Sequence, residues 1–236
     1  MAQSAAHTPM APSIAPYARA ARKHLSGADP VLAAIIAEVG PCRVASRPER
    51  FRALARAIIF QQLAGRAAQT IHDRVVALYP GRTFPTPAQI LATPDDLLRK
   101  AGLSGQKTRY IKDLARHVEE GLLNFHRFPK MEDEEIIADL TRVKGIGRWT
   151  AEMFLMFNLG RPDVMPVGDL GVCNAVMRAY GMRKRPKPER LLKLAERWRP
   201  YRSAAAWYFW QSSDITLPDG KGNKPAAKTR KRPARG

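Results

Sequence analysis

Cysteine is scarce in this chain, which has only Cys42 and Cys173 among its 236 residues. Two cysteines form no disulfide framework, and they cannot supply the four ligands of an iron–sulfur cluster. Long apolar runs are also missing, since no segment approaches the roughly 18 residues of a membrane span. The N-terminus lacks the compact charged-then-apolar pattern of a signal peptide. These absences predict a soluble cytoplasmic protein that does not associate with a membrane.

Acidic residues are few. The chain carries 21 Asp and Glu against 40 Lys and Arg, which gives a formal net charge of +19. Such an excess indicates a polyanionic partner, although composition alone does not choose among DNA, RNA and an anionic surface. The length and the 45% hydrophobic content predict one globular domain with a substantial core.

Alternating polar and apolar runs are too short to predict a sheet, whereas apolar residues recur at helical spacing. We therefore predict an all-α fold. Residues 1–24 are rich in Ala, Pro and Ser and contain no acid, which predicts a poorly ordered segment before a helical domain over residues 25–214. Residues 215–236 read as a disordered basic tail. A tether to a DNA backbone and a solubilising end are both open interpretations of this tail.

A glycine turn between two predicted helices, within residues 134–158, is the most informative feature. Gly145 and Gly147 lie two residues apart, where glycine permits a positive φ and leaves room for the backbone of a ligand. The amides that follow such a turn point outward at a helix N-terminus and suit an anion. Lys144, Arg148 and Thr150 flank them, so these five residues predict a phosphate-binding turn.

Several segments resemble one family. The hairpin sequence VKGIGRWTAEMF and the later MPVGDLGV resemble the signature of the helix-hairpin-helix (HhH-GPD) DNA glycosylase superfamily, and its 3-methyladenine DNA glycosylase II branch is the most similar. FRALARAIIFQQLAGRAAQTI, GLSGQKTRYIKDLA and WRPYRSAAAWYFW also resemble that branch, so the likeness covers roughly residues 30 to 212. The resemblance implies a two-lobed helical glycosylase, here without the N-terminal sheet domain of a known relative.

Asp169, which follows Gly147 by 22 residues, is the predicted catalytic group. As a base leaves, the sugar becomes cationic, and a nearby carboxylate stabilises that charge. A position at the start of the helix predicted over residues 170–180 favours this electrostatic role over strong general-base work. An ordinary N-cap aspartate is the alternative interpretation, and both roles can coexist. Asp163 reads instead as part of a loop.

The resemblance also implies a base pocket, a wedge and a cation site. For the pocket we predict aromatic walls from Trp149 and Trp210, with Met153, Gln61 and Tyr208 as further lining residues. For the wedge that fills the vacated stack, both Gln62 and Leu63 are candidates. The resemblance further implies a monovalent Na or K ion held by the main-chain oxygens of Thr141, Val143 and Ile146, and no other cofactor.

Trp149 occupies the position at which bifunctional relatives carry a catalytic lysine. An indole nitrogen does not form a Schiff base, so we predict base removal by water without strand cleavage. The implied activity is excision of alkylated bases such as 3-methyladenine and 7-methylguanine from double-stranded DNA, by a monomer associated with the nucleoid. A different lesion specificity (oxidised, etheno or deaminated bases) and a non-catalytic DNA-binding module are the alternatives.

Overall fold

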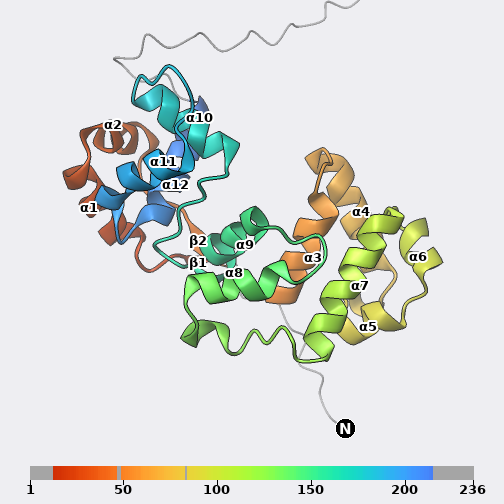
Figure 1. Cartoon of the computed structure of the whole chain (residues 1–236). Helices are drawn as coiled ribbons and strands as arrows, with labels where there is room; N and C mark the ends of the chain where they lie inside the picture. The colour runs from red at the N-terminus through yellow and green to blue at the C-terminus, as the bar shows by residue number, and fades with distance from the viewer. Residues whose placement is uncertain (1–12, 47–48, 83, 215–236) are drawn as a thin grey trace, which may run out of the picture.

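The structure is a computed structural model that describes residues 13–46, 49–82 and 84–214. Within these ranges the chain is helical, which confirms the predicted all-α fold (Figure 1). The α-helices are α1 (Ala18–Ala28), α2 (Pro30–Val39), α3 (Arg50–Phe60), α4 (Gly65–Ala77), α5 (Pro87–Ala92), α6 (Asp95–Lys100), α7 (Gly105–Glu119), α8 (Asp133–Thr141), α9 (Arg148–Phe154), α10 (Leu170–Ala179), α11 (Pro188–Ala195) and α12 (Arg202–Gln211). The short helical segments are η1 (Pro80–Arg82), η2 (Phe128–Lys130), the π-helix η3 (Leu155–Leu159), η4 (Glu196–Trp198) and η5 (Ser212–Asp214). One feature departs from the prediction, because the two-residue strands β1 (Ser13–Ile14) and β2 (Ala45–Ser46) pair in an antiparallel arrangement.

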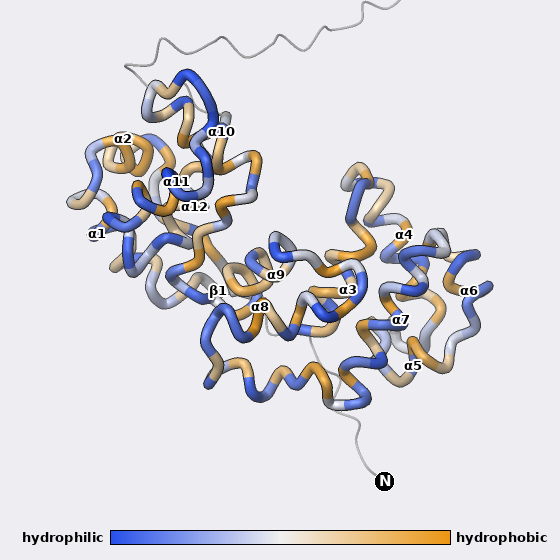
Figure 2. The backbone as a smooth tube through the Cα atoms, viewed as in Figure 1, coloured by the Kyte–Doolittle hydropathy of each residue, from blue (hydrophilic) through white to orange (hydrophobic). Residues whose placement is uncertain are grey.

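The helices form two groups (Figure 1). Helix α12 packs against α1, α2 and α10, and these helices form one group together with α11. In the other group, α3 contacts α4, α7 and α9, while α8 packs on α9. Hydrophobic stretches concentrate in α2, in α3 and around α9, and the connection that follows α10 is hydrophilic (Figure 2). Among the described residues, no helix combines the length and the apolar character that crossing a bilayer requires.

The prediction of poor order over residues 1–24 is wrong for residues 18–24, which belong to helix α1. Ala18, Ala21 and Leu25 are buried and lie on one face at helical spacing. The Ala-rich composition hid this stripe, whose residues are small but sit against α2 and α12. Residues 1–12 and the predicted basic tail over residues 215–236 lie outside the described residues.

Asp29 connects the N-terminal helix α2 to residues near the C-terminal helices. It is 1% exposed, and its Oδ1 caps α2 by accepting hydrogen bonds from the amides of Val31 (2.9 Å) and Leu32 (3.3 Å). Its Oδ2 accepts from Trp198 Nε1 at 2.9 Å and from the hydroxyl of Tyr180. A buried carboxylate is tolerated only with such donors, so this one residue fixes the start of α2 against the C-terminal helices.

Replacing Asp29 by alanine leaves several buried donors without a partner. We expect Asp29→Ala to lower the free energy of unfolding by about 3 kcal/mol or more. Ser104→Ala is the matched control, because Ser104 is also an N-cap but is exposed, and its loss costs about 1 kcal/mol. Urea denaturation of both variants measures the difference. Equal losses would contradict a linking role for Asp29.

Candidate functional site

The two glycines of the turn have different conformations and different roles. Gly145 has φ +86°, and a Cβ added there would lie 2.2 Å from the ring of Tyr110, so no other residue fits. Gly147 has φ −92° and serves as the N-cap of α9, with open space where its Cβ would be. The predicted positive φ therefore applies to Gly145 alone. Gly147 contributes the other predicted property, which is unobstructed access to the backbone.

Some amides of this turn form hydrogen bonds within the protein, and others have no acceptor among the described residues. The amide of Lys144 donates to Asp113 Oδ2 at 2.9 Å, which fixes the turn to α7. The amide of Ile146 donates to the Val143 carbonyl at 3.1 Å. In the part of the chain that the structure describes, the amides of Gly145 and Gly147 donate to no protein acceptor. These two N–H groups remain available for an anion.

Two of the predicted phosphate contacts face other partners. The Arg148 guanidinium donates to both oxygens of Glu134, at 2.9 and 2.5 Å, and to Glu152 Oε1 at 3.0 Å. Its positive charge is thus engaged by carboxylates beside the turn. The Thr150 side chain lies on the inward face of α9 and is 7% exposed. The Lys144 side chain is exposed, as the prediction requires.

Asp169 is the N-cap of α10 and is 7% exposed. Its Oδ1 accepts from the Val172 amide at 2.8 Å and from Trp210 Nε1 at 2.8 Å. Its Oδ2 accepts from Trp149 Nε1 at 2.7 Å. An indole N–H only donates, so both carboxylate oxygens are held as acceptors. The N-cap interpretation of Asp169 is therefore confirmed, while its catalytic role stays a prediction.

The hydrogen bond between Trp149 and Asp169 joins the two helix groups. Trp149 lies two residues after Gly147, on the hairpin helix α9, while Asp169 begins α10 in the other group. The Trp149 side chain therefore connects the helix that follows the glycine turn to the Asp169 carboxylate. This arrangement brings together residues that are 20 positions apart in the sequence.

Of the predicted pocket walls, the two tryptophans meet at Asp169 through their N–H edges. Trp149 is 50% exposed, so its ring faces solvent. Trp210 stacks on Phe157, with ring centroids 5.7 Å apart and an interplanar angle of 28°. Phe157 is half-buried and packs against the core. Met153 is also half-buried, against the core.

Tyr208 and Gln61 do not have the predicted positions. Tyr208 is fully buried, and its hydroxyl donates to the Gly40 carbonyl at 3.1 Å, so it belongs to the core. The sequence does not show that Tyr208 points inward, because nearly every side of α12 is apolar. Gln61 Nε2 donates to the Gly145 carbonyl at 2.7 Å. This side chain braces the glycine turn rather than lining a pocket at Asp169.

The two wedge candidates are both exposed. Gln62 has φ +56°, which is uncommon for a residue other than glycine, and Leu63 is 39% exposed. They lie at the edge of a cavity of about 660 Å³ that also reaches the glycine turn. The lining residues are Gln61, Gln62, Leu63, Ile71, Gly102, Ser104, Gln106, Lys107, Tyr110, Gly145, Ile146 and Gly147. The two wedge candidates and the glycine turn therefore border the same cavity.

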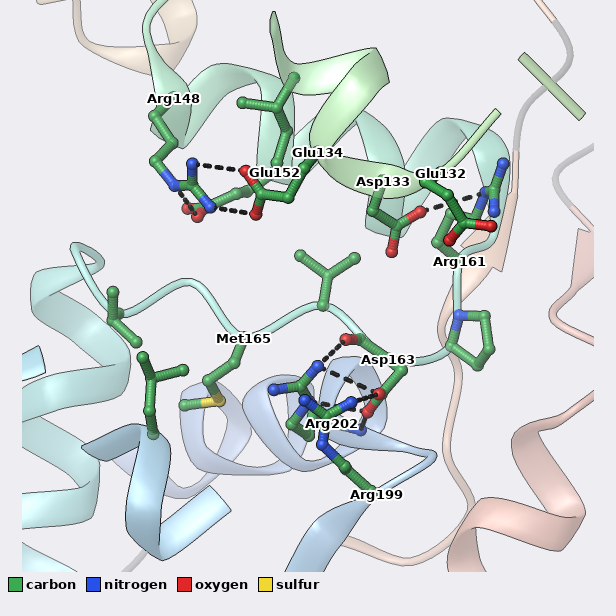
Figure 3. Close-up of a pocket in the computed structure, with 15 residues that line it drawn as sticks. Glu132, Asp133, Glu134, Arg148, Glu152, Arg161, Asp163, Met165, Arg199 and Arg202 are labelled. Atoms are coloured by element: carbon green, nitrogen blue, oxygen red, sulfur yellow. Dashed lines mark hydrogen bonds and ion pairs between the residues drawn. The ribbon is translucent and has the colours of Figure 1, made fainter. Parts of the chain in front are cut away.

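A second cavity, of about 610 Å³, lies between the helix groups (Figure 3). Arg148 with Glu134 and Glu152 forms one wall, and Asp163 with its arginines forms the opposite wall. Asp163 accepts from Arg199 Nη1 at 2.6 Å and from Arg202 Nε at 2.7 Å, which agrees with a structural role. Burial raises the pKa of the Glu152 carboxyl. The arginines Arg148, Arg199 and Arg202 of this cavity are all paired with carboxylates, and we place no substrate there.

Comparison with known proteins agrees with this geometry. The model of the HhH-GPD superfamily of base excision DNA repair proteins matches residues 55–200. The chain belongs to the HhH-GPD superfamily. It is 37% identical to DNA-3-methyladenine glycosylase 1 of Schizosaccharomyces pombe over 202 residues, which cover 83% of this chain and 89% of the relative. This and other relatives named DNA-3-methyladenine glycosylase confirm the predicted branch of the superfamily.

Two solved HhH-GPD structures share the fold. The S. pombe 3-methyladenine DNA glycosylase in complex with abasic DNA has a TM-score of 0.72 at 36% identity, covering 83% of this chain and 97% of that one. A DNA-3-methyladenine glycosidase from Bacillus halodurans has a TM-score of 0.77 at 34% identity, covering 87% and 94%. These matches are long enough to include residues of both helix groups.

This HhH-GPD site contains one residue that the sequence analysis missed. A Cβ added to Gly171 would lie 3.0 Å from Trp210 Nε1 and 3.1 Å from Asp169 Oδ1. A methyl group at this position would therefore press on both partners of the hydrogen bond between Trp210 and Asp169. The signal was present, since GDLG places a glycine in the first turn of a helix, where glycine is otherwise unfavourable.

A basic loop was also missed. In the connection after α10, a span of five positions holds Arg183, Lys184, Arg185 and Lys187, and all four are exposed. Within the described residues, none of them forms an ion pair, whereas Arg148, Arg161, Arg199 and Arg202 all do. Such a loop suits a polyanion. The run RKRPK was the available signal.

Gly171 offers a direct test of the carboxylate geometry. We expect Gly171→Ala to shift the Trp210 indole or the Asp169 carboxylate by a few tenths of an ångström and to lower the rate of the chemistry by about tenfold, because the rate depends steeply on the placement of a catalytic group. Gly168→Ala is the matched control, since Gly168 has open space at its Cβ position. The measurement is a single-turnover rate on alkylated DNA. Similar rates for the two variants would mean that the close contact at Gly171 does not matter.

Proposed function

We propose that this protein is a DNA glycosylase of base excision repair that removes alkylated bases, of the 3-methyladenine and 7-methylguanine type, from double-stranded DNA. It hydrolyses the N-glycosidic bond and leaves an abasic site. The observation that carries the proposal is the hydrogen-bonded set Trp149–Asp169–Trp210, which joins a fixed carboxylate to the helix that begins at the glycine turn with its two free amides. The names of the relatives, which include DNA-3-methyladenine glycosylases, support the same substrate class.

The proposed reaction begins with extrusion of the damaged nucleotide, which costs roughly a few kcal/mol. The amides of Gly145 and Gly147 grip the backbone, and Gln62 or Leu63 fills the gap. The bond between sugar and base then breaks, and its electron pair leaves with the base. The sugar becomes positively charged, water adds to its anomeric carbon, and the proton of that water passes to solvent.

Asp169 stabilises the cationic sugar electrostatically. The carboxylate is almost fully buried, and a charge acts more strongly at a site from which water is excluded. Three N–H donors fix its position before the reaction, so no reorganisation is needed as charge develops. The same donors occupy both oxygens, which makes transfer of a proton from water to Asp169 a secondary role.

The preference for alkylated bases follows from their charge. A purine alkylated at N3 or N7 carries a positive charge, and an electron-rich indole face attracts a cation more than a neutral ring. Trp149 is half-exposed with its ring facing solvent, and the pair of Trp210 and Phe157 adds a second aromatic surface. A neutral leaving base also departs more readily than an anionic one, so such lesions need less catalysis than normal bases.

Two further features belong to the proposal. In the described part of the chain, the carbonyls of Thr141 and Ile146 accept no backbone hydrogen bond, while that of Val143 accepts one from Ile146. These oxygens suit a Na or K ion, which would bring positive charge to the phosphate-binding turn. We also propose that the protein acts as a monomer on the chromosomal DNA of the cytoplasm, since every proposed catalytic group comes from one chain.

The Asp169→Asn variant tests the catalytic role. We expect it to lose excision of methylated bases by about 10²-fold or more, as expected for removal of a group that stabilises charge in the transition state. Binding to DNA that contains an abasic analogue should persist, because the glycine turn is intact. Chromatography of the bases released from methylated DNA measures the loss. Asp96→Asn, on the surface of α6, is the control that should behave like the natural protein.

The outcomes separate the alternatives. Undiminished excision by Asp169→Asn would sink the assignment of the catalytic carboxylate. No excision by the natural protein on any lesion would favour a DNA-binding module without catalysis. Release of oxidised, etheno or deaminated bases in preference to methylated ones would replace the proposed substrate class while leaving the reaction unchanged.

The absence of strand cleavage is a separate expectation. The indole N–H of Trp149 is bonded to Asp169, and no amine occupies that position to attack the sugar. We expect abasic DNA to accumulate and to break only after alkali treatment. Incubation with borohydride should trap no covalent adduct between protein and DNA. An adduct, or strand breaks formed without alkali, would contradict hydrolysis by water alone.

A further inference from the structure

Helix α7 contacts both the wedge loop and the glycine turn through one face. Lys107, Tyr110 and Asp113 are three residues apart on this helix and therefore point to the same side. Each of them touches a different part of the DNA-binding surface described above. None of the three had an assigned role in the sequence analysis.

Lys107 holds the end of α3. Its Nζ donates to the Ile59 carbonyl at 2.7 Å and to the Gln61 carbonyl at 2.8 Å. The last carbonyls of a helix lack partners within the helix and form the negative end of its dipole, so an ammonium group satisfies them well. Burial lowers the pKa of the Lys107 amine. The lysine fixes where α3 stops and where the wedge loop begins.

The next residues connect this loop to the glycine turn. Gln61 donates through Nε2 to the Gly145 carbonyl at 2.7 Å. The backbone then turns at Gln62, with φ +56°, and Leu63 follows in an exposed position. A non-glycine residue is strained in this conformation and keeps it only where its surroundings dictate it. Lys107 and Gln61 supply those surroundings.

The same face of α7 also packs against the glycine turn. The ring of Tyr110 fills the space beside Gly145 where any Cβ would clash. Asp113 Oδ2 accepts the amide of Lys144 at 2.9 Å, and Asp113 is itself 6% exposed. Two elements that are about 84 positions apart in sequence thus rest on one rigid helix, and Gln61 joins them directly.

We propose that the Lys107–Tyr110–Asp113 face of α7 is a spacer that sets the distance between the wedge loop and the phosphate-binding amides. The proposal rests on the proposed function, because that function requires a wedge inserted at a fixed offset from a gripped phosphate. Lys107 and Gln61 are positioning residues in this view. They hold the wedge in its inserting conformation before DNA arrives, so less ordering has to be done on binding.

The expected consequence is specific to base extrusion. Without the spacer, the wedge loop is free to move, and a paired duplex base should be extruded less often. A nucleotide that is already unstacked needs no wedge, because the cost of extrusion has been removed. A defect caused by the spacer therefore depends on the DNA, whereas a general loss of folding affects every substrate equally.

The test uses the full chain carrying Asp169→Asn, so that it does not depend on excision. To this protein we add Lys107→Met, Gln61→Met or, as the matched control, Lys112→Met. Lys112 lies on the same helix and pairs with Asp95 of α6, so the control removes an equal charge from α7 away from the loop. The probe is 2-aminopurine at the target position, either paired in a duplex or placed in a single-base bulge. The rise in its fluorescence at saturating protein reports unstacking.

We expect Lys107→Met and Gln61→Met to reduce the fluorescence rise on the paired duplex by about fivefold or more and to leave the bulged DNA unaffected, with Lys112→Met unchanged on both. An equal reduction on both DNAs, or none on either, would overturn the spacer. So would a parent protein that never unstacks the paired probe. A protein that unstacks the probe but, with Asp169 restored, excises nothing would refute the proposed function while the spacer stands.

Discussion

The structure depends on how one buried carboxylate is kept hydrogen-bonded. Asp169 needs donors because a buried charge without them is costly, and it obtains them from Val172, Trp149 and Trp210. These donors come from α10, from the hairpin helix and from the last long helix. The need to pair this one carboxylate therefore fixes three separate segments relative to one another. A glycine at position 171 leaves space for the Trp210 indole beside Asp169 Oδ1.

The pairing of buried polar groups also explains why two amides of the glycine turn are free. Most buried backbone groups are paired, so an unpaired N–H persists only where solvent or a ligand takes its place. Here Asp113 satisfies the amide of Lys144, and Tyr110 blocks the space beside Gly145, while Gly147 faces open space. Support on one side leaves the other side available. The turn is rigid without being closed, as phosphate recognition requires.

Sequence reasoning succeeded where the chemistry is local and failed where it depends on orientation. The N-cap position of Asp169 and the need for glycine at position 145 follow from neighbouring residues. The direction of an indole does not, so the hydrogen bonds from Trp149 and Trp210 to Asp169 were not predicted. Arg148 read as a free cation because Glu134, 14 residues away, is brought beside it only by the fold.

The charge distribution shows which of these interactions belong to the fold and which face a partner. A net charge of +19 repels itself, so each cation that can be paired internally lowers the cost of the compact state. Arg148, Arg161 and Arg202 are paired at the junction between the helix groups. The exposed cations of the loop after α10 have no such partner among the described residues. Positive charge is thus neutralised where the fold needs it and retained on the surface, where only a polyanion can neutralise it.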